Sequence, residues 1–137
     1  MKKLLLLTSL FLILTICLIS CGSQKAKNES YEKASQQLEA YSFEVDYYND
    51  EEITSIENDI NRIGIELSGG LSKVSHYIKE EYGEITYAYI YVFELDTDAF
   101  KFVQEYPNNF DPTDFFITIN ENTVVFGNLE EIVNLEI

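Results

Sequence analysis

Residues 73–95 of this 137-residue chain read KVSHYIKEEYGEITYAYIYVFEL, and the other predicted elements can be placed around this stretch. Apolar and aromatic residues alternate with other residues on both sides of Tyr82-Gly83, which is typical of two paired strands. Glycine readily adopts the positive φ of a tight hairpin, so Tyr82-Gly83 predicts a two-residue turn. Glu81 then faces Glu84, and the pairing that continues outward places His76 opposite Tyr89.

The predicted register divides the hairpin into two faces. One face receives seven alternating residues: Val74, His76, Ile78, Tyr87, Tyr89, Tyr91 and Phe93. The opposite face includes an apolar and aromatic group: Tyr77, Ala88, Ile90 and Val92. If this second face is uncovered, the group forms a contiguous patch of the kind that marks a partner-binding site. The alternative is that the segment from Tyr31 to Tyr41, or a terminal helix, covers it.

Three elements are predicted before the hairpin. The spacing of Tyr31, Ala34, Leu38 and Tyr41 predicts an amphipathic helix over residues 30–41. The alternation from Phe43 to Tyr47 predicts a half-buried strand. A second helix follows, in which Asn49 and Glu52 form a capping box and Gly64 takes the left-handed position after the C-terminal cap. Its apolar stripe consists of four isoleucines: Ile53, Ile56, Ile60 and Ile63.

The elements predicted after the hairpin complete an α+β fold. They are a helix capped by Asp96 or Thr97 and ended by Pro107, strands over 115–119 and 123–126, and a short helix capped by Asn128 with Glu131. This order is that of a ferredoxin-like split β-α-β-β-α-β unit with one added strand. We expect two helices on one face of a mostly antiparallel sheet and a less covered opposite face, in a single acidic domain over residues 30–137.

The first residues of the chain have the pattern of an export signal. Lys2 and Lys3 precede an apolar run from Leu4 to Ile19, which ends in a small residue and a cysteine. Leu18-Ile19-Ser20-Cys21 resembles the lipobox of bacterial lipoproteins. The resemblance implies a signal peptide over residues 1–20, a diacylated Cys21 and a lipidated tether over residues 21–29. The alternatives are an ordinary signal peptide with a chance cysteine, or a transmembrane anchor, for which the apolar run is short.

Charge and cysteine content restrict the function. Residues 1–20 hold two of the nine basic residues and none of the 24 acidic ones, so the remainder carries 7 − 24 = −17. This charge argues against nucleic acid, whose phosphates require Lys and Arg, and favours cationic partners or cations. Only Cys21 remains after the signal, and its acylation would exclude disulfides, thiolate zinc sites and thiol nucleophiles.

Two weaker chemical signals are present in the sequence. His76 is the only histidine and therefore the only possible His base, although its position within a strand favours a sheet residue. Asp96-Thr97-Asp98 resembles the start of a calcium loop, and Asp111 and Asp114 could lie nearby. An EF-hand would need glycine and glutamate at the positions that Lys101 and Pro107 occupy, so helix capping explains Asp96 more simply.

The sequence therefore predicts a lipid-anchored protein on the extracytoplasmic face of a bacterial cell membrane, or of the outer membrane in a host that has one. We expect a non-enzymatic module that binds an envelope protein or peptide, with no nucleic-acid partner and no cofactor beyond the lipid on Cys21. The alternative is weak Ca²⁺ binding through Asp96, Asp98, Asp111 and Asp114. A third interpretation is an enzyme that uses His76.

Overall fold

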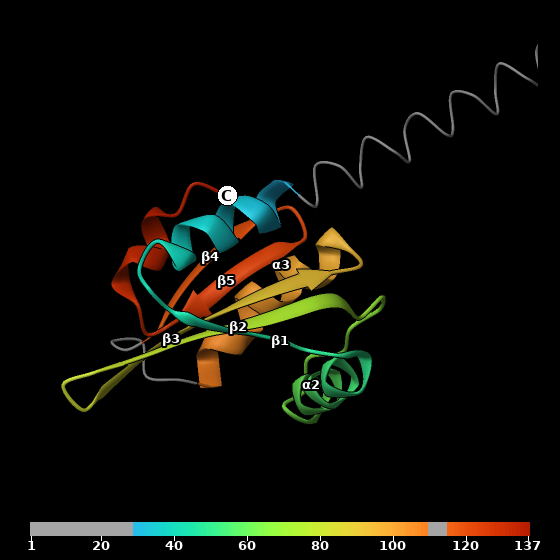
Figure 1. Cartoon of the computed structure of the whole chain (residues 1–137). Helices are drawn as coiled ribbons and strands as arrows, with labels where there is room; N and C mark the ends of the chain where they lie inside the picture. The colour runs from blue at the N-terminus through green and yellow to red at the C-terminus, as the bar shows by residue number, and fades with distance from the viewer. Residues whose placement is uncertain (1–28, 110–114) are drawn as a thin grey trace, which may run out of the picture.

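The computed structural model describes residues 29–109 and 115–137, which form a five-stranded antiparallel sheet between two helical layers (Figure 1). The strands are β1 (Glu44–Tyr47), β2 (Leu71–Glu81), β3 (Glu84–Phe93), β4 (Phe116–Asn120) and β5 (Thr123–Gly127), in the order β1-β2-β3-β5-β4. A first helix covers residues 29–39 and is called the 29–39 helix below. The other helices are α2 (Asp50–Arg62) and α3 (Asp96–Glu105), and two 3-10 turns are η1 (Tyr106–Asn109) and η2 (Glu130–Asn134).

The β2–β3 hairpin has the predicted turn and register. Tyr82 and Gly83 both have positive φ, +55° and +83°, as a two-residue hairpin turn of this kind requires. Glu81 pairs with Glu84, and His76 pairs with Tyr89. The register shifts by one residue only between Leu71 and Lys73, next to the start of β2. The turn chemistry was therefore sufficient to assign both faces of the hairpin.

Helix α2 begins and ends as its sequence predicts. The Asn49 side chain accepts hydrogen bonds from the Glu51 and Glu52 amides, and the Glu52 carboxylate accepts one from the Asn49 amide, which completes the capping box. At the other end Gly64 has φ +93°, and the amide of Ile65 donates to the carbonyl of Ile60 at 3.2 Å. These bonds satisfy backbone groups that a helix terminus otherwise leaves without partners.

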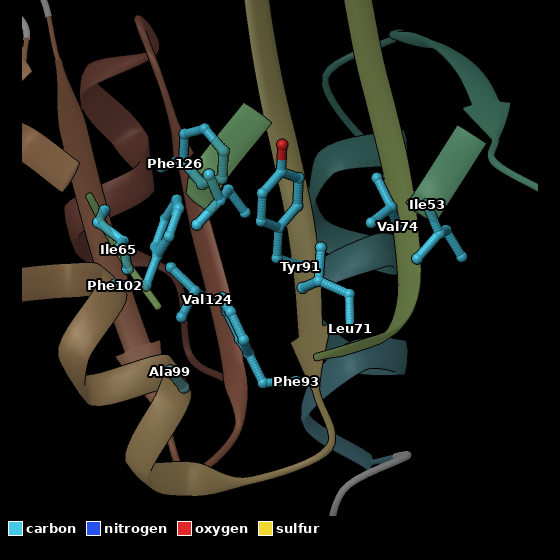
Figure 2. Close-up of a cluster of buried hydrophobic side chains, with 11 residues drawn as sticks. Ile53, Ile65, Leu71, Val74, Tyr91, Phe93, Ala99, Phe102, Val124 and Phe126 are labelled. Carbon is cyan, nitrogen blue, oxygen red and sulfur yellow. The ribbon is translucent and has the colours of Figure 1, made fainter. Parts of the chain in front are cut away.

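The first core lies between the sheet and the layer formed by α2 and α3. Ile53 and Ile60 of α2 and Phe102 of α3 pack against buried residues of β3 and β5, among them Tyr91 and Phe126 (Figure 2). The ring of Phe102 lies 5.5 Å from Tyr91 and 5.4 Å from Phe126 between centroids, distances at which aromatic rings attract. The prediction of two helices on one sheet face is confirmed.

The second sheet face is covered over its central strands, which corrects the expectation of a less covered face. Tyr31, Ala34 and Leu38 of the 29–39 helix pack on it, and Ile132 of η2 extends the cover. Each of these side chains is buried, and most of the strand residues beneath them are apolar, with Ser75 and Thr123 as buried polar exceptions. Two packed layers thus enclose the sheet, because both faces of its central strands are apolar and must be removed from water.

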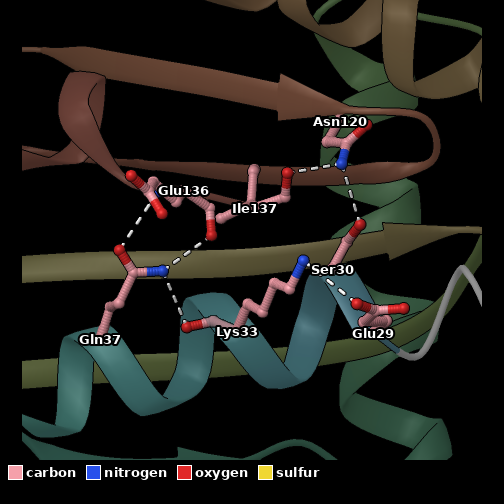
Figure 3. A network of polar contacts seen from close by, with 7 residues as sticks. All are labelled: Glu29, Ser30, Lys33, Gln37, Asn120, Glu136 and Ile137. Atoms are coloured by element: carbon pink, nitrogen blue, oxygen red, sulfur yellow. Dashed lines mark hydrogen bonds and ion pairs between the residues drawn. The ribbon is translucent and has the colours of Figure 1, made fainter.

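Polar contacts fasten the 29–39 helix to residues far along the chain. Gln37 donates to the carbonyl of Glu136 at 2.9 Å and accepts from its amide at 3.1 Å (Figure 3). Asn120 donates to the hydroxyl of Ser30 at 3.1 Å and also to the carbonyl of Ile137. The helix is therefore an integral part of the folded domain.

The order of the strands differs from a split β-α-β unit. In such a unit a third strand separates the two strands that flank the helix, whereas β1 and β2 are direct antiparallel neighbours here. The sequence of β1 suits an edge position, since Glu44, Asp46 and Tyr47 are exposed. The central strand β3 is instead buried from Ile90 to Phe93, as both faces of a central strand require.

Two predicted helix caps differ from the structure. Leu95 is the N-cap of α3 and makes no side-chain capping bond, so neither Asp96 nor Thr97 caps this helix. Asn128 does not cap η2: its side chain accepts from the Tyr87 amide at 2.7 Å and donates to the Ile85 carbonyl at 2.8 Å. Asn128 thereby continues the pairing of β5 with β3 by one residue. The sequence pattern of a helix cap does not distinguish this role from capping.

Candidate functional site

The apolar group predicted as a partner site is inaccessible in the folded domain. Tyr77, Ala88 and Ile90 are completely buried, and Val92 is 7% exposed. The Tyr77 hydroxyl donates to Ser35 of the 29–39 helix at 2.8 Å, so this face is bonded to its cover. The alternative interpretation, in which the segment from Tyr31 to Tyr41 covers the face, is the one that the structure supports.

Asp98 has a structural role that differs from calcium binding. Its buried carboxylate accepts hydrogen bonds from the amides of Ser68, Gly69 and Gly70 at 2.9, 2.7 and 3.3 Å. Both carboxylate oxygens therefore hold the loop that leads into β2, while Asp96 lies in the first turn of α3. Within residues 29–109 and 115–137, no group of three or more His, Cys, Asp or Glu side chains could hold a metal ion. Cys21, Asp111 and Asp114 lie outside the described residues.

His76 lies on the sheet face, as its alternation predicts. Its ring stacks on Tyr89 with centroids 4.3 Å apart and planes 6° from parallel. Partial burial lowers the pKa of His76, and the nearby Asp46 carboxylate opposes this shift. The ring packs as a neutral aromatic group within the sheet.

A cluster of tyrosines gathers on the same face, toward α2 and η1. Burial raises the pKa of Tyr89 to about 12, and the neighbouring hydroxyl of Tyr48 adds to the shift. Burial also raises the pKa of Tyr91, with further contributions from Tyr106 and Tyr89. Burial likewise raises the pKa of Tyr106. These hydroxyls are neutral at physiological pH and can both donate and accept hydrogen bonds.

A cavity of about 240 Å³ opens beside this cluster, and we call it the Tyr91 pocket. Its lining residues come from α2 and the C-cap residue that follows it, from β3 and from η1: Ile56, Asp59, Ile60, Ile63, Tyr91, Tyr106 and Asn109. Figure 2 shows the Tyr91 hydroxyl pointing away from Leu71 and Phe93. The pocket therefore combines an apolar wall from α2 with polar groups from three different elements.

The Asp59 carboxylate gives the rim of the Tyr91 pocket a negative charge. Asp59 pairs with Arg62 one turn along α2 at 3.0 Å, and both side chains are largely exposed. Exposed pairs of this spacing contribute only about 0.3–0.5 kcal/mol, so an incoming cation can share or replace Arg62. The exposed Ile63 provides apolar surface beside the rim.

The Tyr91 pocket was not predicted from the sequence, because its residues are far apart along the chain. The isoleucine stripe of α2 correctly indicated a core-facing surface. One signal could have been used: Asp59 lies three residues after Ile56 and four before Ile63, and such residues are neighbours on a helix surface. An acid beside an apolar stripe is common on surface helices, so this signal alone would not have identified a pocket.

Comparison with protein-family models, with curated proteins and with solved structures found no match. No helix among the described residues has the length and apolar character needed to cross a bilayer.

Proposed function

We propose that this protein is a lipid-anchored extracytoplasmic binding module that recognises a basic side chain of a partner protein or peptide in the Tyr91 pocket. The observation that carries the proposal is the pocket itself, in which an apolar wall, neutral tyrosine hydroxyls and one carboxylate converge. Ligand sites typically combine apolar walls with a few convergent polar groups.

A lysine or arginine side chain matches these groups best. Its methylene stem would lie along Ile56 and Ile60, as long basic side chains do on apolar surfaces. Its charged end would meet the Asp59 carboxylate and the hydroxyl oxygen of Tyr91 or Tyr106, which can accept a hydrogen bond. The net charge of −17 that remains after residues 1–20 would draw basic partners toward the protein.

The size of the Tyr91 pocket supports a side chain rather than a large ligand. Sites for drug-sized molecules occupy roughly 300–1,000 Å³, whereas this cavity holds about 240 Å³. One long side chain of a protein partner is the natural occupant of such a volume, and the surrounding surface of α2 would contact the rest of that partner.

The lipobox supports the anchoring part of the proposal. With acylated Cys21 in the bilayer, residues 22–28 could span at most about 25 Å, so the domain would stay close to the membrane surface. We expect Cys21→Ala to abolish fatty-acid labelling. The mature, lipid-anchored form should also be lost from the membrane fraction. A labelled Cys21→Ala protein would refute lipid attachment at this residue without affecting the pocket.

Peptide titration tests the pocket. The full-length protein in detergent micelles would be titrated with acetylated tri-lysine and tri-glutamate amides, and amide NMR shifts would be followed. We expect tri-lysine to shift the amide signals of Ile56 and Ile63. Asp59→Asn should weaken its binding by up to about fivefold, because loss of a largely exposed charge contact costs at most about 1 kcal/mol. Asp50→Asn, at the start of the same helix, is the matched control. Equal binding of both peptides, or an unchanged affinity in Asp59→Asn, would contradict the proposal.

A further inference from the structure

The β2–β3 hairpin extends beyond the sheet as an isolated arm (Figure 1). The last β1 pair joins Glu44 to Ile78, and the last β5 pair joins Ala88 to Gly127. Asn128 supports the β3 side as far as Ile85. Among the described strands, residues 79–81 and 84–86 therefore pair only with each other, and we call residues 79–86 the hairpin tip.

The hairpin tip presents large apolar side chains to solvent. Tyr82 is fully exposed, and Ile85 is 56% exposed. Tyr82 also adopts φ +55°, a conformation that a bulky side chain rarely takes and that glycine or asparagine would take more easily. Packing does not explain a tyrosine at this fully exposed position, whereas tyrosine is among the residues that most often dominate binding at protein interfaces.

The charges of the hairpin tip restrict its partner. Glu80, Glu81 and Glu84 outnumber Lys79, which pairs with Glu81 at 3.0 Å. Glu81 lies directly opposite Glu84, an arrangement that disfavours the folded hairpin. A second copy of this acidic chain and an anionic lipid surface would both repel the tip, so its complement is a positively charged surface.

The hairpin tip and the Tyr91 pocket are separate surfaces. Tyr82 and Tyr91 lie nine positions apart along the strand, which corresponds to roughly 30 Å at about 3.3 Å per residue. Figure 1 shows α2 and the tip near opposite ends of the sheet. The start of the 29–39 helix also lies at the end of the sheet away from the tip. Ser30 bonds Asn120, Asn120 pairs with Thr123, and Thr123 pairs with Val92 near the end of β3.

We infer that the hairpin tip is a second interaction surface, which inserts Tyr82 and Ile85 into an apolar pocket with a basic rim on a partner protein. The full exposure of Tyr82, its positive φ and the excess of glutamates carry this inference together. The tip lies at the end of β3 opposite the start of the 29–39 helix, so a chain anchored through its N-terminal residues presents the tip away from the membrane.

Site-specific photocrosslinking in cells that make the protein tests this inference. The photoreactive amino acid p-benzoylphenylalanine would replace Tyr82 in the full-length chain and, as a matched control, the exposed Tyr47 of the edge strand β1. We expect one discrete protein adduct from position 82. The same adduct from position 47 should be at least tenfold weaker. Mass spectrometry should place the crosslinked partner residue in a segment that contains lysine or arginine.

A charge-reversed tip completes the test. Glu80→Lys with Glu84→Lys should reduce the adduct from position 82 at least tenfold. This variant should still fold, because Glu84→Lys puts a positive charge opposite Glu81, and an unchanged melting temperature checks this. An adduct that persists in this variant, equal adducts from positions 82 and 47, a chain dimer, a lipid adduct or no adduct would each overturn the inference.

Discussion

Leu38→Ala is the substitution that best tests whether the 29–39 helix belongs to the folded domain. Leu38 is completely buried in the core between this helix and the sheet. Truncation of a buried leucine costs about 3 kcal/mol, from lost apolar burial and from the cavity that remains. At roughly 4 °C per kcal/mol for a domain of this size, the melting temperature should fall by about 12 °C.

The assay is thermal and urea unfolding of the chain that begins at Gly22, followed by circular dichroism. Tyr41→Ala is the matched control, because Tyr41 follows the same helix but is 40% exposed; we expect it to cost less than about 1 kcal/mol. The two variants should differ in the urea midpoint and keep the same slope.

A Leu38→Ala protein that melts like the wild type would refute this reasoning. The 29–39 helix would then contribute nothing to stability, and the sheet face beneath it would be available to a partner, as the uncovered-face interpretation of the sequence supposed. A loss of the expected size would instead mean that a partner can reach Ile90 only by displacing the helix.

Four further outcomes are expected. Ile90→Lys should prevent folding at 37 °C, as judged by circular dichroism, because it places an unpaired charge in a closed core; a folded variant would contradict the burial. Asp98→Asn should cost about 2–3 kcal/mol in urea unfolding, because a carboxamide has one acceptor oxygen for three amides; an unchanged midpoint would be inconsistent with this network. Tyr82→Gly should raise stability by about 1 kcal/mol, since glycine adopts positive φ freely, and a lower melting temperature would count against strain at the turn. In an alkaline titration at 295 nm, Tyr89 should ionise near pH 12, after the exposed tyrosines. Because its folded pKa is raised, its contribution to stability is complete below pH 10 and is lost as the pH rises from 10 to 12; ionisation of all tyrosines in one step near pH 10 would disprove the burial.

Local chemistry explains which parts of the fold could be predicted from the sequence. The register of the β2–β3 hairpin follows from two turn residues, and the bounds of α2 follow from Asn49, Glu52 and Gly64, all within a few positions of the bonds they determine. Periodicity likewise indicated the 29–39 helix and which of its residues face inward. Such signals need no knowledge of distant segments.

The remaining features depend on contacts between distant residues. The order of the strands depends on which strands are apolar on both faces and therefore lie at the centre of the sheet. A four-residue strand such as β1 is too short to show from its sequence whether it is central or at an edge. Asn128 has the sequence context of a helix cap, yet its side chain bonds the β3 backbone about forty positions earlier in the chain. The Tyr91 pocket likewise requires α2, β3 and η1 to meet before any of its properties exists.

The contact between Gln37 and Glu136 also has a consequence for the order in which the chain folds. Ribosomes make residue 37 long before residue 136, and the two residues are separated by 99 positions. A helix as short as the 29–39 helix is only marginally stable alone in water. It must therefore remain undocked until β3, β5 and residues 130–137 have been synthesised. During that interval the apolar face of the sheet is exposed to aggregation, and a chaperone would have most effect at this stage.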